Sequence, residues 1–208
     1  GAMESATRHL IARWQDGETR DIAQAMMTLA LNIVGGTIFG VPDLADSADL
    51  TRATAVMQQY SGNTLTRSKL VAVTEADCRE AVRVLDELVA SVLAKHQAQG
   101  ARDLITLMKT ATDPETGERM SDQEIRDEAL TLLMAGHEST ANGLAWTFYL
   151  LATHPDAEAR LRAEIEAQVG GRAVVVDDLP HLPYLERVLK ESLRLYPPAW
   201  LMGRTPLN

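Results

Sequence analysis

The chain has 208 residues, of which 46% are hydrophobic and 24% charged, and this balance is typical of a globular protein with a substantial core. Its formal net charge of −9 argues against a nucleic-acid-binding surface, because phosphate contacts need clustered lysine and arginine. The single cysteine, Cys78, excludes an internal disulfide and favours a reducing compartment. We find no signal-peptide pattern and no internal repeat.

Hydrophobic periodicity predicts a series of helices in the first half of the chain. Residues 1–3 are interpreted as the remnant of a cleaved expression tag, which leaves 4–208 as a single helical domain. Residues 19–22 are expected to form a connector or one short edge strand, and 61–74 a polar connection. The glycine pair at 35–36 weakens the second helix or lets a neighbouring segment approach closely. The predicted helices cover 5–15, 23–39, 47–60, 75–98 and 103–110.

One long helix over about 122–153 dominates the second half. Ser121 and Glu124 form a capping box at its start, and Pro155 ends it because the residue before a proline avoids the α conformation. No alternation of strands and helices is visible, so the prediction is a mainly α fold, a helical bundle around this long helix. After it we expect a charged surface helix over 156–169, an extended piece over 174–176, a turn over 178–183 and a last helix over 184–196.

Glu138 is the one formally charged residue between Glu128 and the end of the long helix. A helix that is apolar nearly all round is normally buried, so this carboxylate is either a functional group or part of an ion pair with an arginine on a packed neighbour. A membrane span is disfavoured, because polar residues at 137–142 interrupt the apolar run at its centre. A zinc signature of the His-Glu-x-x-His type is excluded, because Ala141 stands where the second histidine should be. No residue is assigned as a metal ligand.

Four small residues, Gly136, Ser139, Thr140 and Gly143, share one face of the long helix. Such a face permits either a close helix crossing or the approach of a flat ligand or small substrate. Glu138 stands beside the Ser139 hydroxyl, and an acid next to an alcohol is the arrangement that a proton relay needs.

A second candidate region begins at Glu191 and Arg194, which share one face of the last helix and are expected to pair. The apolar, proline-led segment 197–204 follows this helix. We expect that segment to turn back over the fold rather than enter solvent.

Residues 135–140, AGHEST, resemble the oxygen-activation motif of the cytochrome P-450 haem-thiolate monooxygenases. Glu191-x-x-Arg194, followed by two prolines, resembles the Glu-x-x-Arg helix of the same family. The motifs stand in the family's order, and the resemblance runs over essentially the whole chain, from the family's D or E helix to just past its K helix. It implies a partial cytochrome P-450 fold.

The resemblance also implies roles for individual residues. Glu138 would be the acid that delivers protons to bound oxygen, and Ser139 would hold the alcohol position, where the family usually has threonine. Glu191 and Arg194 would be structural. The other implied positions are Ala135 and Gly136 for the oxygen groove, Ala199, Trp200, Leu201 and Met202 for substrate contact, and Arg204 for a haem propionate.

The implied cofactor is haem, and the implied partners are a small organic substrate and an electron-transfer protein, either a ferredoxin or a flavoprotein. The family's iron ligand is a cysteine in a Gly-rich loop after the Glu-x-x-Arg helix, whereas Cys78 lies in a charged helical segment. We therefore expect a truncated portion of a monooxygenase. The alternative is a haem-free helical fragment, inactive alone and self-associating as a homo-oligomer through exposed apolar surface. A cytoplasmic location is expected, without nucleic-acid or membrane binding.

Overall fold

The computed structural model describes residues 1–66, 72–95, 103–201 and 204. Within these ranges every regular element is a helix, which confirms the mainly α prediction. Two compact units divide the chain, and α6 (Asp122–Thr153) contributes to both of them. Unit 1 comprises Gly1–Thr19 and Met27–Glu138, and unit 2 comprises Arg20–Met26 and Ser139–Asn208. The single domain expected from the sequence stays a prediction.

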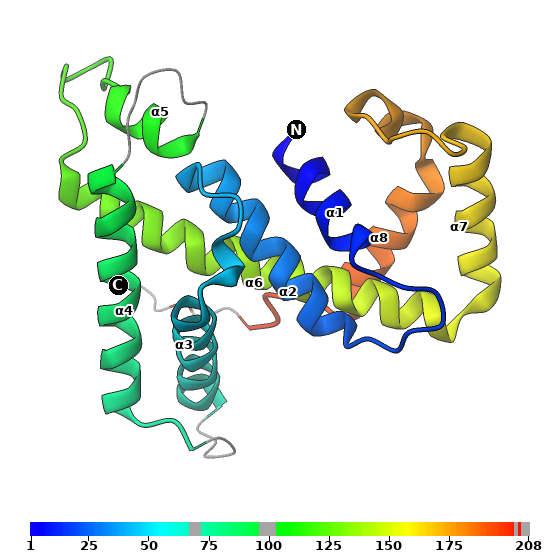
Figure 1. The fold of residues 1–208 in the computed structure, drawn as a ribbon, viewed down its shortest axis with the longest axis horizontal. Coiled ribbons are helices and arrows are strands. Elements are labelled where there is room, and N and C mark those ends of the chain that lie inside the picture. Colours follow the sequence, from blue (N-terminus) through cyan, green and yellow to red (C-terminus); the bar gives the residue numbers. More distant parts are fainter. Residues whose placement is uncertain (67–71, 96–102, 202–203, 205–208) are drawn as a thin grey trace. The chain divides into compact units, whose positions relative to one another are not determined.

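Unit 1 contains the hydrophobic core, to which α2, α3, α4, α5 and the first half of α6 all contribute. Helices α3 and α4 pack along each other and lie side by side in Figure 1. The most deeply buried large side chains are aliphatic and come from five helices, as the amphipathic patterns of these segments require. They are Leu31, Leu50, Val89, Ile105, Ile125 and Leu133. The helices with residues in unit 1 are α1 (Ala2–Ala12), α2 (Ile22–Val34), α3 (Ala48–Thr66), α4 (Glu75–Lys95), α5 (Leu104–Thr110) and α6.

A π-helical turn, η1 (Gly35–Phe39), continues α2, and a 3₁₀ turn, η2 (Leu44–Asp46), follows it. Gly40 closes η1 in the left-handed conformation with φ of 67°, which glycine adopts without steric cost. The Gly35 carbonyl accepts a hydrogen bond from the Val41 backbone N–H at 2.9 Å. The chain therefore folds back tightly on Gly35, and the close approach expected at this glycine pair is present at its first member.

Unit 2 contains the second half of α6, then α7 (Pro155–Gln168), η3 (Val176–His181) and α8 (Pro183–Leu195). Helix α7 packs against α8. Glu164 of α7 accepts hydrogen bonds from the backbone N–H groups of Tyr184 and Leu185, at 2.8 and 2.9 Å. This carboxylate therefore caps the first turn of α8, where backbone donors have no partner within the helix.

Several local predictions need correction. No strand forms at 19–22, because Asp21 caps α2 by accepting from the backbone N–H of Gln24 at 3.0 Å. The extended piece at 174–176 and the turn after it are replaced in part by the 3₁₀ turn η3. Helix α3 runs on to Thr66, through residues predicted as a connection. Helix α1 includes Ala2 and Met3, and their interpretation as a tag remnant stays a prediction. The predicted end of the helix over 75–98 lies outside the described residues.

The long helix agrees with its prediction in both bounds and cap. Ser121 and Glu124 form a reciprocal capping box: the Ser121 backbone N–H donates to the Glu124 carboxylate at 2.7 Å, and the Glu124 backbone N–H donates to the Ser121 hydroxyl oxygen at 3.3 Å. Among the described residues, one stretch, Ile22–Phe39, is long and apolar enough to cross a membrane by length and composition. The core helix of a soluble protein meets the same criterion, and residues of this stretch lie in the unit 1 core.

Candidate active site

The motif of residues 135–140 lies in the middle of α6, where the helix presents its residues to different surroundings. Ala135 is exposed and Gly136 is half-buried, with the Val34 side chain 3.5 Å from where a Cβ at Gly136 would lie. His137 is only 3% exposed, and its ring Nδ1 lies 2.6 Å from the Leu133 carbonyl oxygen. The most buried polar residue of the motif is therefore the histidine rather than the carboxylate.

Glu138 is half-buried and accepts a hydrogen bond from the Nε2 of Gln58 on α3, at 2.9 Å. The sequence predicted either a functional carboxylate or an ion pair with an arginine at this position. It did not predict an amide partner. The two residues are 80 positions apart, so no local pattern could have indicated this pair. A neutral donor satisfies one carboxylate oxygen without adding a positive charge.

Ser139 and Thr140 are exposed in the described structure, and the two glycines of the same face are packing positions. A Cβ at Gly143 would lie 3.5 Å from Leu193 and 3.7 Å from Pro198, both of unit 2. These distances are ordinary van der Waals contacts, so the close-crossing interpretation stays a prediction for the glycines. The ligand interpretation remains a prediction for Ser139 and Thr140.

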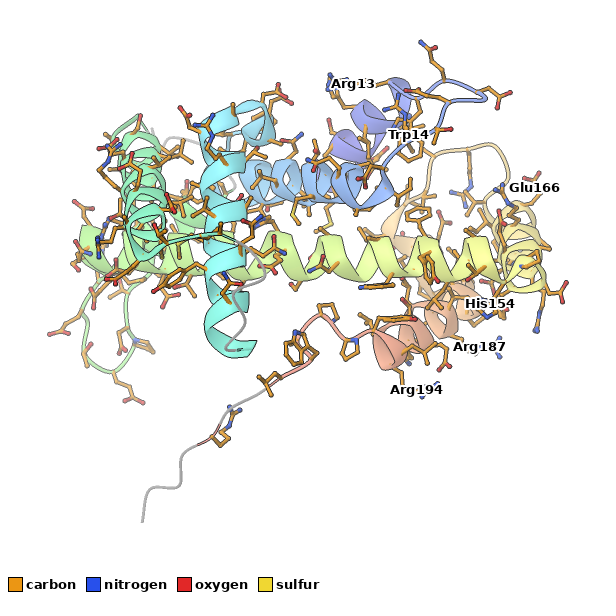
Figure 2. All side chains as sticks on the ribbon, turned by 90° about the horizontal axis from the view of Figure 1, so that it is seen from below. Arg13, Trp14, His154, Glu166, Arg187 and Arg194 are labelled. Carbon is orange, nitrogen blue, oxygen red and sulfur yellow. The ribbon has the colours of Figure 1, made fainter. Side chains whose placement is uncertain are left out.

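Glu191 and Arg194 pair on α8 as expected, through two hydrogen bonds of 2.8 and 2.6 Å. The Arg194 guanidinium lowers the pKa of the Glu191 carboxyl, and the same contact raises the pKa of Arg194. The two side chains are 55% and 66% exposed, respectively, so this ion pair adds little to stability by itself. In Figure 2 Arg194 lies on the outer side of α8.

Contacts that sequence reasoning missed join α8 to the second half of α6 within unit 2. The buried hydroxyls of Thr147 and Ser192 lie 2.9 Å apart. The rings of Trp146 and Tyr196 stack at 4.0 Å between centroids. A half-open cavity of about 370 Å³ lies beside them, with a lining that is largely apolar. Hydrophobic periodicity around Trp146 and Thr147 could not predict these partners, because they lie about 50 residues further along the chain.

The segment after α8 departs from its prediction. Ala199, Trp200, Leu201 and Arg204 are all exposed, and Trp200 is 63% exposed. Pro198 does pack near Gly143, but the described residues after it are exposed rather than covered by the fold. Met202 lies outside the described residues.

The family model of cytochrome P450 matches residues 2–208. The chain belongs to the cytochrome P450 family. A relative from Streptomyces melanosporofaciens, cyclooctat-9-en-7-ol 5-monooxygenase, is 34% identical over 98% of this chain and 46% of its own length. A bifunctional cytochrome P450/NADPH–P450 reductase of Fusarium oxysporum is 38% identical over 58% of this chain and 11% of its own length.

Among solved structures, the cytochrome P450DA haem domain superposes with a TM-score of 0.81 at 31% identity. The match covers 93% of this chain and 44% of that one. The chain thus spans about half the length of the curated relatives that it matches from end to end. The P450 assignment made from the two motifs is confirmed, and so is the partial helical P450 fold.

The P450 family implies haem, whose iron is held by a cysteine thiolate, and Cys78 is the one cysteine of this sequence. Cys78 is half-buried in α4, and its Sγ lies 3.6 Å from the Met57 Sδ of α3. No group of three or more His, Cys, Asp or Glu side chains in the described ranges could hold a metal ion. The described thiol itself does not fit an axial haem ligand, because it packs against another sulfur within a helix.

Proposed function

We propose that this chain is the central helical portion of a cytoplasmic, haem-dependent monooxygenase. Such an enzyme inserts one oxygen atom of O₂ into an organic substrate with electrons from a redox partner. The observation that supports the proposal is the P450 family match over 2–208, with AGHEST in the middle of α6 and the paired Glu191 and Arg194 on α8.

Within this proposal the motif residues of α6 have two roles, to deliver protons and to leave space beside the proton-delivery pair. Glu138 is the acid of the proton-delivery pair, because it is a half-buried carboxyl held by a neutral donor. Ser139 supplies the alcohol, and Ala135 and Gly136 leave room beside them because neither has a side chain larger than a methyl group. The Glu191–Arg194 pair serves to position α8.

The substrate class we propose is a small, largely apolar organic molecule. The Streptomyces relative is named for a cyclic alcohol, and the apolar residues 199–202 supply matching surface. Arg204 is the proposed contact to a haem propionate. The proposed electron donor is a flavoprotein or ferredoxin, and the Fusarium relative, by its name, joins a P450 to its reductase.

A second function is favoured by the surroundings of Cys78. Because the Cys78 thiol is packed against Met57 within a helix, we propose that the 208-residue species alone is a non-catalytic helical module that self-associates. The large exposed apolar side chains of unit 2 supply the surface for this association. They include Trp146, Phe148, Tyr149, Leu193, Leu195, Trp200 and Leu201.

Haemin titration of the purified chain tests the second function. We expect no red-shifted, thiolate-type Soret band after reduction under carbon monoxide, because Cys78 lies in a packed helix. Appearance of that band in the wild type, and its loss in Cys78→Ala, would show that this chain ligates iron by itself.

The monooxygenase role is tested in a chimera in which residues 2–208 replace the matching part of the cyclooctat-9-en-7-ol 5-monooxygenase. Once a thiolate-type spectrum shows that haem is bound, product formed per O₂ consumed is measured. Glu138→Gln is expected to lower that yield by roughly tenfold or more, since a positioned acid contributes at least this much. An unchanged yield would contradict the role of Glu138.

A further inference from the structure

The hydrogen bond between Gln58 and Glu138 is a long-range contact to the one carboxyl assigned to proton delivery. A carboxylate oxygen only accepts hydrogen bonds, so the amide nitrogen of Gln58 must be the group that faces it. The donor-to-acceptor distance of 2.9 Å is that of a well-formed bond. Both residues belong to unit 1.

Buried neighbours anchor both ends of this bond. On α3, Ala53 and Thr54 are buried one turn before Gln58, and Thr54 bonds back to the Leu50 carbonyl at 3.1 Å. On α6, His137 is buried directly before Glu138. The two backbones are therefore fixed by core packing, and the hydrogen bond limits the remaining rotamer freedom of the glutamate side chain.

A side-chain amide can form hydrogen bonds with a carboxyl group in both its ionised and its protonated form. The ionised carboxylate accepts from the Gln58 N–H. The protonated carboxyl can still accept there, while its O–H donates to the amide oxygen of the same side chain. An arginine or lysine at position 58 would instead favour the charged form alone.

We propose that Gln58 is a positioning residue that holds Glu138 for proton transfer in both of its protonation states. The proposal rests on the proposed function of Glu138. Helix α3 contains neither sequence motif. The proposal gives it a part in positioning the proton-delivering side chain of α6.

The contact itself is tested by NMR on the full 208-residue chain, independently of activity. The side-chain amide signals of Gln58 are identified by their loss in Gln58→Leu. Glu138→Ala should shift these signals and leave those of Gln59, the exposed next residue on α3, in place. Gln58 signals that do not move in Glu138→Ala would overturn the proposal.

The positioning role is tested in the chimera. Gln58→Leu should lower product per O₂ by about tenfold with the substrate KM unchanged, because a misplaced acid slows only steps that use it. Gln58→Lys should also lower the yield, whereas Gln59→Leu, the matched control, should not. Equal far-ultraviolet circular dichroism of the variants excludes unfolding. If Glu138→Gln lowers the yield and Gln58→Leu does not, the positioning role is wrong; if Glu138→Gln itself is neutral, the proposed function fails.

Discussion

At Gly35 the backbone of η1 lies against the turn that follows it. A Cβ at this position would overlap the Val41 carbonyl oxygen and would lie 2.6 Å from the Leu44 Cβ. At Gly36, the next residue, the nearest atoms would be Ala2 Cβ at 3.7 Å and Pro42 Cα at 3.8 Å, which are ordinary contacts. Adjacent glycines in one turn thus have opposite steric surroundings.

We expect Gly35→Ala to lower the free energy of unfolding by about 3 kcal/mol, because backbone rather than a flexible side chain must move. Gly36→Ala is the matched control and should change it by less than about 0.5 kcal/mol. Urea unfolding followed by circular dichroism measures both changes. Equal effects of the two substitutions would contradict the close approach at Gly35.

At the scale of single elements, α8 depends on a cap supplied by another helix. Pro183 begins α8 without an N–H, and the next two N–H groups both donate to Glu164 of α7. Glu164→Ala should therefore cost about 1.5 kcal/mol of stability, as the loss of a side-chain cap usually does. Glu166→Ala removes the same charge from the same helix at an exposed position and should cost less than about 0.5 kcal/mol. Thermal unfolding gives the melting temperature of each variant. Equal melting temperatures would contradict the capping role of Glu164.

Prediction from the sequence succeeded where the cause of a structure is local. The Ser121–Glu124 box and the Glu191–Arg194 pair each join residues three positions apart, and both form as expected. Prediction failed where the partner is distant, as for Gln58 with Glu138, because no periodicity links residues on separate helices. The roles assigned to Glu138 and Ser139 came from resemblance alone and stay predictions.

At the scale of the whole molecule, the self-association proposed above rests on the exposed apolar side chains of unit 2. We expect light scattering after size exclusion to give a mass above that of one chain. A Phe148→Lys/Leu193→Lys variant, charged at two exposed positions, should shift the protein toward the monomer. Ile11→Lys, an exposed position in unit 1, is the control and should leave the mass unchanged. A wild-type monomer at high concentration would contradict this prediction.

The stack of Trp146 on Tyr196 also gives a spectroscopic signal of the contact between these two rings. Two rings held parallel at 4.0 Å give an asymmetric near-ultraviolet dichroism signal that disappears when α8 separates from α6, whereas Trp14 reports by fluorescence from unit 1. The dichroism is followed in Trp200→Phe, and Trp14 fluorescence is followed under the same conditions in Trp146→Phe/Trp200→Phe, where Trp14 is the remaining tryptophan. Loss of both at one denaturant concentration would mean that the units unfold as one cooperative body, and loss at two would mean that each melts alone.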